Sequence, residues 1–150
     1  DARRQQKRTW ATPKAPWVDR LASAWLIKRF IDKGAKFAWI DSPRGRRKHA
    51  VGFDFDGADF THVENHVTFE VLLASFGLDG DPALASIGRA VHFLDIGGIP
   101  VAEAKGLEAI LRGVKGKARN DDVLALEAGR IFDSLYSAYA LENQPAQQPS

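Results

Sequence analysis

Residues 16–32 read PWVDRLASAWLIKRFID, and this stretch decides how the first half of the chain folds. Its apolar side chains recur at steps of three and four residues, which is the spacing of one face of an α-helix. The residues on that face are Val18, Leu21, Ala22, Trp25, Leu26 and Phe30. Gly34 follows closely and is a residue type that ends helices. The pattern therefore predicts an amphipathic helix that ends near Gly34, with Arg29 beside its apolar face.

The residues after this helix carry strand patterns. Residues 37–40 form a short apolar run with aromatic and β-branched side chains, and a loop follows them. Residues 51–56 alternate between apolar and polar, Gly57 offers a turn, and residues 60–63 are a second extended candidate. These segments predict a small β-sheet or a hairpin in the first half of the chain.

The second half of the sequence is helical in pattern. Thr68 is placed to cap one helix, and Asp81 followed by Pro82 is a typical start for the next. Two more helices follow, one after Pro100 and the last and longest after Asn120. Together with the helix after Pro16, these predict a mainly α (α+β) fold of about five helices, with the small sheet or hairpin in its first half.

Length and composition favour one globular domain. The chain has 150 residues, of which 45% are hydrophobic and 27% charged, enough to form a core without disulfides or a structural metal. We expect a disordered basic tail over residues 1–9, a single domain over residues 10–142, and a disordered tail over residues 143–150. No apolar run is long enough to cross a bilayer, so membrane contact is not expected. The cytoplasm is the expected compartment, with export to the periplasm as the alternative.

The net charge of +2 is unevenly distributed along the chain. Basic residues gather at the start and again over residues 44–48. We interpret both groups as solvated surface, because no aromatic side chains interleave with the second one, and nucleic-acid binding by this domain alone is disfavoured. Cysteine is absent, which excludes disulfides and thiolate ligands. The common phosphate-loop, dinucleotide-binding and hydrolase motifs are absent as well.

A group of histidines and carboxylates in the middle third is the strongest candidate site. His92 and Asp95 are three residues apart on a predicted helix, so their side chains project from the same face. His62 lies on the second extended segment, Glu70 in the first turn of the next helix, and Asp54 on the alternating segment. Imidazole and carboxylate ligands suit a divalent metal ion, namely Zn, Mn or Fe, with coordination positions left for water or substrate.

Each member of this group also has a structural interpretation. Glu70 near a helix start is favoured by the helix dipole, His92 fits a hydrogen-bonded core histidine, and Asp54 fits a turn. His49 and His66 fit exposed surface positions. The metal site therefore depends on whether these side chains, distant in sequence, converge on one point.

Residues 16–32 also resemble the signature of the chromate resistance family, in the form of its ChrB C-terminal-type domain. Four later segments of the chain also resemble the family and come in the same order as in its members: Phe53-Asp54, His62, Thr68-Phe-Glu70, and His92 with Asp95. The similarity spans about residues 10–139. The resemblance implies a role in bacterial chromate resistance, in some members as the sensing part of a regulator of a chromate efflux operon. The chain departs from many relatives at Ile96-Gly97-Gly98, where they carry more polar sequence, so ligands beyond Asp95 stay undefined.

The resemblance also implies which residues form a site. Family members keep polar residues at the positions matching Asp19, Arg20, Arg29, Asp54, His62, Glu70, His92 and Asp95. The guanidinium groups of Arg20 and Arg29 would suit a tetrahedral oxyanion such as chromate, and pairing with Asp19 or Asp32 is their structural alternative. Because the chain has no cysteine, it has no thiols with which to reduce chromate itself.

Three hypotheses about function stay open. The first is a metal-binding sensory or resistance module responding to chromate, with His62, His92, Asp95 and Glu70 as ligands and Asp54 as a ligand or an orienting group. The second is a metal-dependent enzyme that uses a metal-activated water or a redox metal, so enzymatic activity is left open. The third is a metal-free interaction domain of a transcriptional regulator, in which the polar group is an internal hydrogen-bond network. A homodimer is compatible with all three.

Overall fold

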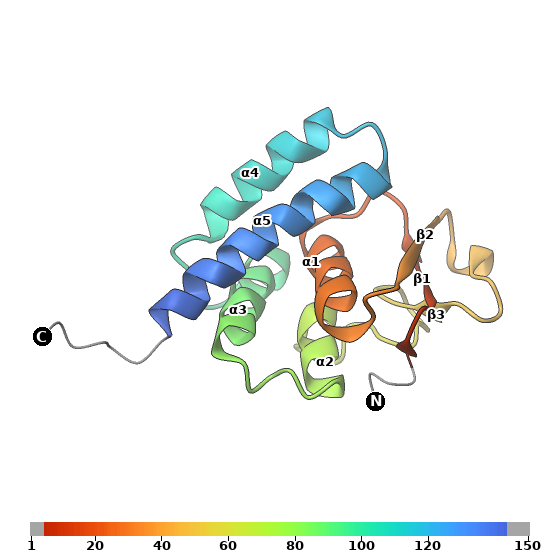
Figure 1. Cartoon of the computed structure of the whole chain (residues 1–150), viewed down its shortest axis with the longest axis horizontal. Helices are drawn as coiled ribbons and strands as arrows, with labels where there is room; N and C mark the ends of the chain where they lie inside the picture. Colours follow the sequence, from red (N-terminus) through yellow and green to blue (C-terminus); the bar gives the residue numbers. More distant parts are fainter. Residues whose placement is uncertain (1–4, 144–150) are drawn as a thin grey trace, which may run out of the picture.

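The computed structural model describes residues 5–143 and has a helical body with a small sheet at one end (Figure 1). The elements in chain order are β1 (Thr9–Pro13), α1 (Val18–Leu26), the π-helical turn η2 (Ile27–Ile31), β2 (Lys36–Ile40), the 3-10 turn η3 (Pro43–Gly45), β3 (Val51–Gly52), α2 (Thr68–Ser75), α3 (Pro82–Ile96), α4 (Ala104–Lys117) and α5 (Asp121–Glu142). The expected fold class, five helices with a small sheet in the first half, is confirmed. None of the described helices is long and apolar enough to cross a membrane.

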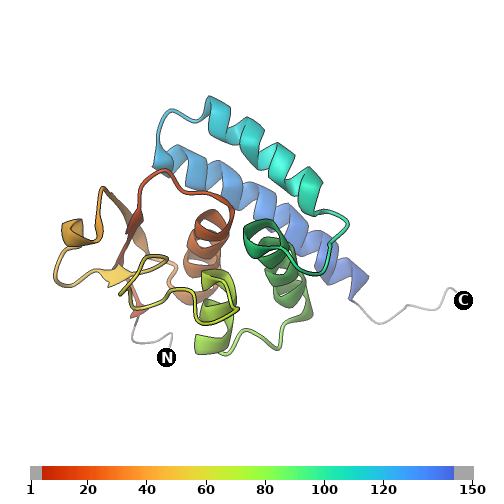
Figure 2. The same cartoon turned by 180° about the vertical axis from the view of Figure 1, so that it is seen from behind.

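Helix α1 lies in the middle of the helical body and packs against α2, α3 and α5 (Figure 1, Figure 2). Leu21, Ala22 and Leu26 are fully buried and Trp25 is nearly so, as the spacing of the apolar residues predicts. The helix continues through η2 and ends at Asp32, close to the predicted end at Gly34. This central helix positions most of the side chains discussed below.

The sheet consists of three parallel strands in the order β2-β1-β3. The central strand β1 pairs with β2 over its whole length and with β3 at Trp10 and Ala11. The hairpin alternative is therefore wrong, because β3 pairs with β1, and the chain after β3 meets residues 60–63 only through one parallel bridge, Phe53–Phe60, and not as an antiparallel pair. The reason lies at Asp54, where a φ of 60° turns the chain out of the extended conformation and its N–H donates to the carbonyl of Phe60 at 2.8 Å.

The start of the described chain is part of the fold. The backbone N–H groups of Lys7 and Arg8 donate to the Asp32 carboxylate at 2.6 and 2.8 Å, just before β1 begins. Residues 5–9, which are predicted from the sequence to belong to a tail, are thus joined to the rest of the fold through Lys7 and Arg8. Beyond Asn143, which ends α5, the expected C-terminal tail lies outside the described residues, as do residues 1–4.

Two predicted helix starts are confirmed. The carboxylate of Asp81 accepts the N–H groups two and three residues further on, at 2.9 and 3.2 Å, where α3 begins. The side chain of Asn120 accepts the N–H three residues further on, at 2.8 Å, where α5 begins. Thr68 differs, because it is the first residue of α2 and not its cap. The first N–H groups of α2 find their acceptor elsewhere in the chain.

Asp81 also joins α3 to α5, since its second oxygen accepts the hydroxyl of Tyr136 at 2.7 Å. Replacing Asp81 by alanine is expected to lower the free energy of unfolding by about 2 kcal/mol, because it removes the cap and leaves the hydroxyl without its acceptor. Urea denaturation measures the change. Tyr136→Phe removes only the second contact and should cost roughly half as much. An Asp81→Ala protein as stable as the wild type would contradict this account.

Candidate metal centre

Three side chains that are distant in sequence meet at one point on the structure. Asp19 comes from the first turn of α1, His62 from the loop between β3 and α2, and Asp95 from the last turn of α3. One potential ligand atom of each lies within 4.8 Å of the other two. The Nε2 atom of His62 is 3.0 Å from Oδ2 of Asp19 and 3.6 Å from Oδ2 of Asp95. We call these three residues the central cluster.

Asp19 has a second role, because its carboxylate caps α2. The backbone N–H of Thr68 donates to Oδ2 at 3.0 Å and that of Phe69 donates to Oδ1 at 2.9 Å. The first N–H groups of a helix have no acceptor within the helix, and a negative charge there is favoured by the helix dipole. The side chain of Asp19 is only 4% exposed. Its carboxylate is therefore held in one orientation by backbone donors from an element 49 residues away.

Asp54 lies at the border of the central cluster. Its Oδ1 is 3.5 Å from Nε2 of His62 and accepts the hydroxyl of Thr68 at 2.8 Å. Its Oδ2 accepts Nε of Arg20 at 3.0 Å, and that guanidinium also donates to the carbonyl of Pro13 at 3.2 Å. The left-handed backbone of Asp54 is uncommon for a residue other than glycine, and such conformations gather at functional sites. Asp54 is thus an oriented neighbour of the cluster.

The other two predicted ligands form a pair of their own. Nδ1 of His92 is 2.7 Å from Oε1 of Glu70, and the same oxygen accepts the backbone N–H of Val67 at 3.1 Å. Neither residue belongs to the group of mutually close ligand atoms found within residues 5–143. Glu70 follows Thr68 in the first turn of α2, and His92 precedes Asp95 by one turn of α3. The structure therefore holds this pair next to the central cluster but with different partners.

Burial and mutual repulsion perturb the carboxylates of the central cluster. Burial, and after it the charge of Asp54, raises the pKa of Asp19 to about 6, although the hydrogen bond from Phe69 lowers it. Burial also raises the pKa of Asp95, against the lowering effect of His62. Both carboxylates are harder to ionise here than in water, and a cation between them would favour their charged forms. A cation bound at this site would therefore offset the cost of keeping both carboxylates charged.

The two arginines predicted to bind an oxyanion lie at different places. Arg20 lies beside the central cluster, as described above. Arg29 pairs with Asp133 of α5, with Nη1 to Oδ1 at 2.9 Å. Neither arginine takes the structural partner expected from the sequence, Asp19 or Asp32, so that expected pairing is wrong. Only Arg20 is placed to act together with the central cluster.

Asp19 is the member of the cluster that is not among the ligands predicted from the sequence. In the sequence it is an acidic residue in the first turn of a helix, which the helix dipole explains by itself. Its burial and its capping of α2 arise only from the contact between α1 and α2. The one indication in advance is that the resembling family keeps a polar residue at this position.

Two carboxylates and one imidazole are ligands that zinc, manganese and ferrous iron accept. With three protein ligands, coordination positions remain for water or a small ligand. The side chains of His62 and Asp95 are 41% and 31% exposed, so solvent reaches the cluster. The arrangement can hold a divalent ion that stays open to small molecules.

Comparison with known proteins gives one clear match. The family model described as ChrB, C-terminal domain, matches residues 10–139. Protein ChrB of Cupriavidus metallidurans (strain ATCC 43123 / DSM 2839 / NBRC 102507 / CH34) is 54% identical over 140 residues, which are 93% of this chain and 43% of that protein. The chain thus spans less than half the length of this relative. No solved structure matches.

Proposed function

Because the chain belongs to the ChrB C-terminal domain family, we propose that it is a divalent-metal-binding module of bacterial chromate resistance, with its ion held by Asp19, His62 and Asp95. The observation that carries the metal proposal is the convergence of these three ligand atoms within 4.8 Å of one another. The link to chromate rests on the family, and the metal site rests on geometry. The two parts are tested separately.

The central cluster is placed so that an ion would affect the fold. Its residues come from α1, from the loop before α2 and from α3, and Asp19 also holds the start of α2. An ion bound to all three would favour the one arrangement in which these elements meet. A sensory module needs such a coupling between binding and conformation. Arg20 is the oxyanion-binding group of this proposal, because it lies beside the central cluster and 21% of its side chain is exposed, although Asp54 already accepts its Nε–H.

Calorimetric titration of the chelator-treated protein with Zn²⁺, Mn²⁺ and, without oxygen, Fe²⁺ tests the metal site. We expect at least one of the three to bind with one ion per chain. His62→Ala should weaken that binding by about tenfold or more, which corresponds to a loss of about 1.4 kcal/mol. His66→Ala is the matched control, because His66 is an exposed histidine four residues away that bonds to Val63 through its backbone.

Two results would end the metal proposal. One is that none of the three ions binds. The other is that His62→Ala and His66→Ala bind the ion equally well, since the heat would then come from exposed histidines. The metal-free alternative, in which the cluster is a hydrogen-bond network, predicts that His62→Ala changes only the stability of the fold.

A second candidate function is catalysis by the bound ion, and the exposure of His62 and Asp95 favours it. An enzyme of this kind would need at least one exchangeable water molecule on the ion. Water-proton relaxation of the Mn²⁺-loaded protein counts such molecules. Rapid exchange of one or more waters would support the catalytic function, whereas a closed coordination shell would favour sensing alone.

A further inference from the structure

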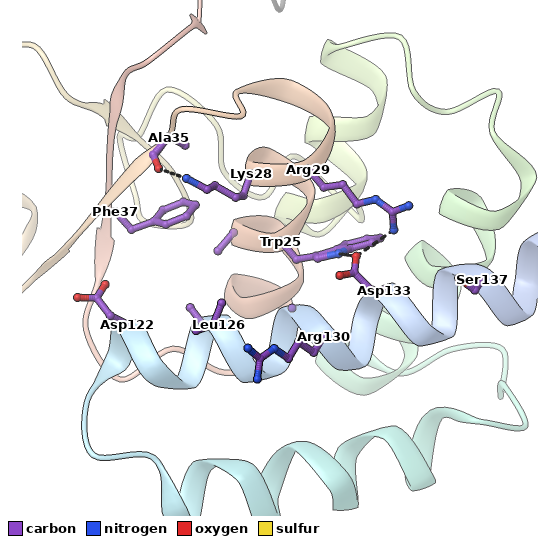
Figure 3. A pocket seen from close by; sticks show the side chains of 13 residues that line it. Trp25, Lys28, Arg29, Ala35, Phe37, Asp122, Leu126, Arg130, Asp133 and Ser137 are labelled. Atoms are coloured by element: carbon purple, nitrogen blue, oxygen red, sulfur yellow. Dashed lines mark hydrogen bonds and ion pairs between the residues drawn. The ribbon is translucent and has the colours of Figure 1, made fainter.

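A cleft of about 740 Å³ lies between α1 with its continuation η2 on one side and α5 on the other (Figure 3). Trp25, Lys28 and Arg29 reach it from α1 and η2, while Leu126 and Arg130 reach it from α5. The residues of the central cluster and the Glu70–His92 pair do not line it. The cleft is therefore a separate feature, and its volume is in the range of small-molecule sites.

The walls of the cleft are mainly apolar. The ring of Trp25 forms part of one wall, and Phe37 of β2 lines the end nearest the sheet. Leu126 lines the opposite side with 59% of its surface exposed. A ligand with a flat apolar part could cover these side chains and remove their apolar surface from water, which is favourable.

Gly129 keeps the cleft open. It lies inside the 22-residue helix α5, where a glycine costs about 1 kcal/mol compared with alanine. A Cβ atom built at this position would lie 3.7 Å from Cδ1 of Trp25, which is ordinary contact, so backbone crowding does not require glycine here. A larger side chain at position 129 would instead extend over the Trp25 ring and occupy the cleft.

Both arginines that line the cleft are paired with carboxylates. The carboxylate of Asp133 accepts both Arg29 and the indole N–H of Trp25, at 2.9 and 2.8 Å. Arg130, in the middle of α5, pairs with Glu127 at 3.0 Å. At the end of the cleft nearest the sheet, the Asp122 carboxylate accepts the neutral indole N–H of Trp39 at 2.8 Å and keeps its charge. Lys28 instead donates to a carbonyl oxygen, that of Ala35, at 2.9 Å.

Lys28 is therefore the cation available to a ligand. Within residues 5–143 no carboxylate lies within ion-pair distance of its ammonium group, and an ammonium has three donors, of which the carbonyl uses one. Figure 3 shows the side chain of Lys28 reaching toward Ala35, at the end of the cleft where Phe37 lies. A negatively charged group placed there would form a charge-assisted hydrogen bond without displacing another acid.

We propose that this cleft binds a small organic anion with a flat, apolar body. The body would lie against Trp25, Phe37 and Leu126, in the space that Gly129 leaves, and its carboxylate or sulfonate would reach Lys28. An inorganic oxyanion lacks the apolar body, and a neutral aromatic compound lacks the charge. The proposal is independent of the metal site.

Naphthoate is the probe, and the indole N–H signals in proton–nitrogen correlation spectra are the readout. The four tryptophans divide into two pairs. Trp25 lines the cleft and Trp39 donates to Asp122, which also lines it, while Trp10 donates to Asp32 and Trp17 lies beside Lys115 of α4. We expect naphthoate to shift the signals of the first pair in a saturable manner and to leave those of the second pair in place. Shifts in neither pair, or equal shifts in all four, would overturn the proposal.

Variants and ligand analogues separate the two parts of the recognition. Gly129→Leu should abolish the shifts, whereas Gly113→Leu, at an open position on α4, should not. Lys28→Gln should weaken naphthoate binding about tenfold and leave weak binding of naphthamide, its neutral analogue, unchanged. If naphthamide binds as tightly as naphthoate, or if sulfate alone shifts Trp25, the assignment to an organic anion is wrong. If Gly129→Leu does not fold, Lys28→Gln decides, because full naphthoate affinity in that variant would overturn the site.

Discussion

Replacement of Asp19 by alanine is expected to lower the free energy of unfolding by about 3 kcal/mol and to abolish metal binding. The loss of stability follows from the two backbone N–H groups of Thr68 and Phe69, which donate to this carboxylate and belong to fully buried residues. Without Asp19 these donors have no acceptor and no access to water. Urea denaturation measures the first effect and calorimetric titration the second.

Two neutral substitutions separate these effects. Asp95→Asn removes a ligand from the central cluster without touching the cap of α2, so it should lose the metal and keep its stability. Asp19→Asn keeps one oxygen that can accept an N–H of α2 and also reduces the repulsion with Asp54, so it should cost less stability than Asp19→Ala. If Asp19→Ala unfolds at the same urea concentration as the wild type, the cap does not have the role described here. If it still binds the ion as tightly, Asp19 is not a ligand.

The parts of the fold that the sequence predicts are those determined by near neighbours. The cap at Asp81 and the cap at Asn120 each involve residues two or three positions away, so both can be read locally. The apolar spacing of α1 is local for the same reason. In contrast, β1 is defined by its pairing with β2 and β3, which follow it by about 25 to 40 residues. It comes directly after the basic residues at the start of the chain, and it ends at Pro13. Nothing local marks it as the central strand.

The candidate site shows the same division. Three of the predicted residues, Asp54, His62 and Asp95, lie close together. His92 and Asp95 project from one face of α3 as expected, but they contact different partners, because Glu70 reaches His92 from the start of α2. Which acid pairs with which histidine depends on how α2 and α3 pack. The spacing of residues along the sequence does not show which of these side chains lie close together in the fold.

Asp32 is expected to contribute more to stability than any other single polar side chain discussed above. Its carboxylate accepts the backbone N–H groups of Lys7, Arg8 and Gly34 and the indole N–H of Trp10, a residue that is fully buried. It therefore fastens the start of β1 to the end of η2. Replacement by alanine should lower the free energy of unfolding by about 4 kcal/mol, because four donors lose one charged acceptor.

The effect of Asp32 should also depend on pH in a defined direction. Burial raises the pKa of Asp32, but the hydrogen bonds from Trp10, Arg8, Lys7 and Gly34 together outweigh it, so the pKa lies below its ordinary value of 3.8. Above that value the carboxylate is charged in both states and its full contribution is present. As the pH falls below 3.8 toward the lowered pKa, the unfolded chain takes up the proton more readily than the fold does, so the contribution is lost.

Urea denaturation of the wild type and Asp32→Asn, from neutral pH down to acid, measures this dependence. The difference in free energy of unfolding should be largest at neutral pH and should shrink in the acid range. Asp41→Asn is the control, because Lys14 lowers the pKa of Asp41 as well, although this carboxylate is 85% exposed. Water screens that exposed pair, so its removal should leave the unfolding midpoint unchanged at every pH. A difference for Asp32→Asn that does not change with pH would mean that the shape of the side chain, and not its charge, fastens β1.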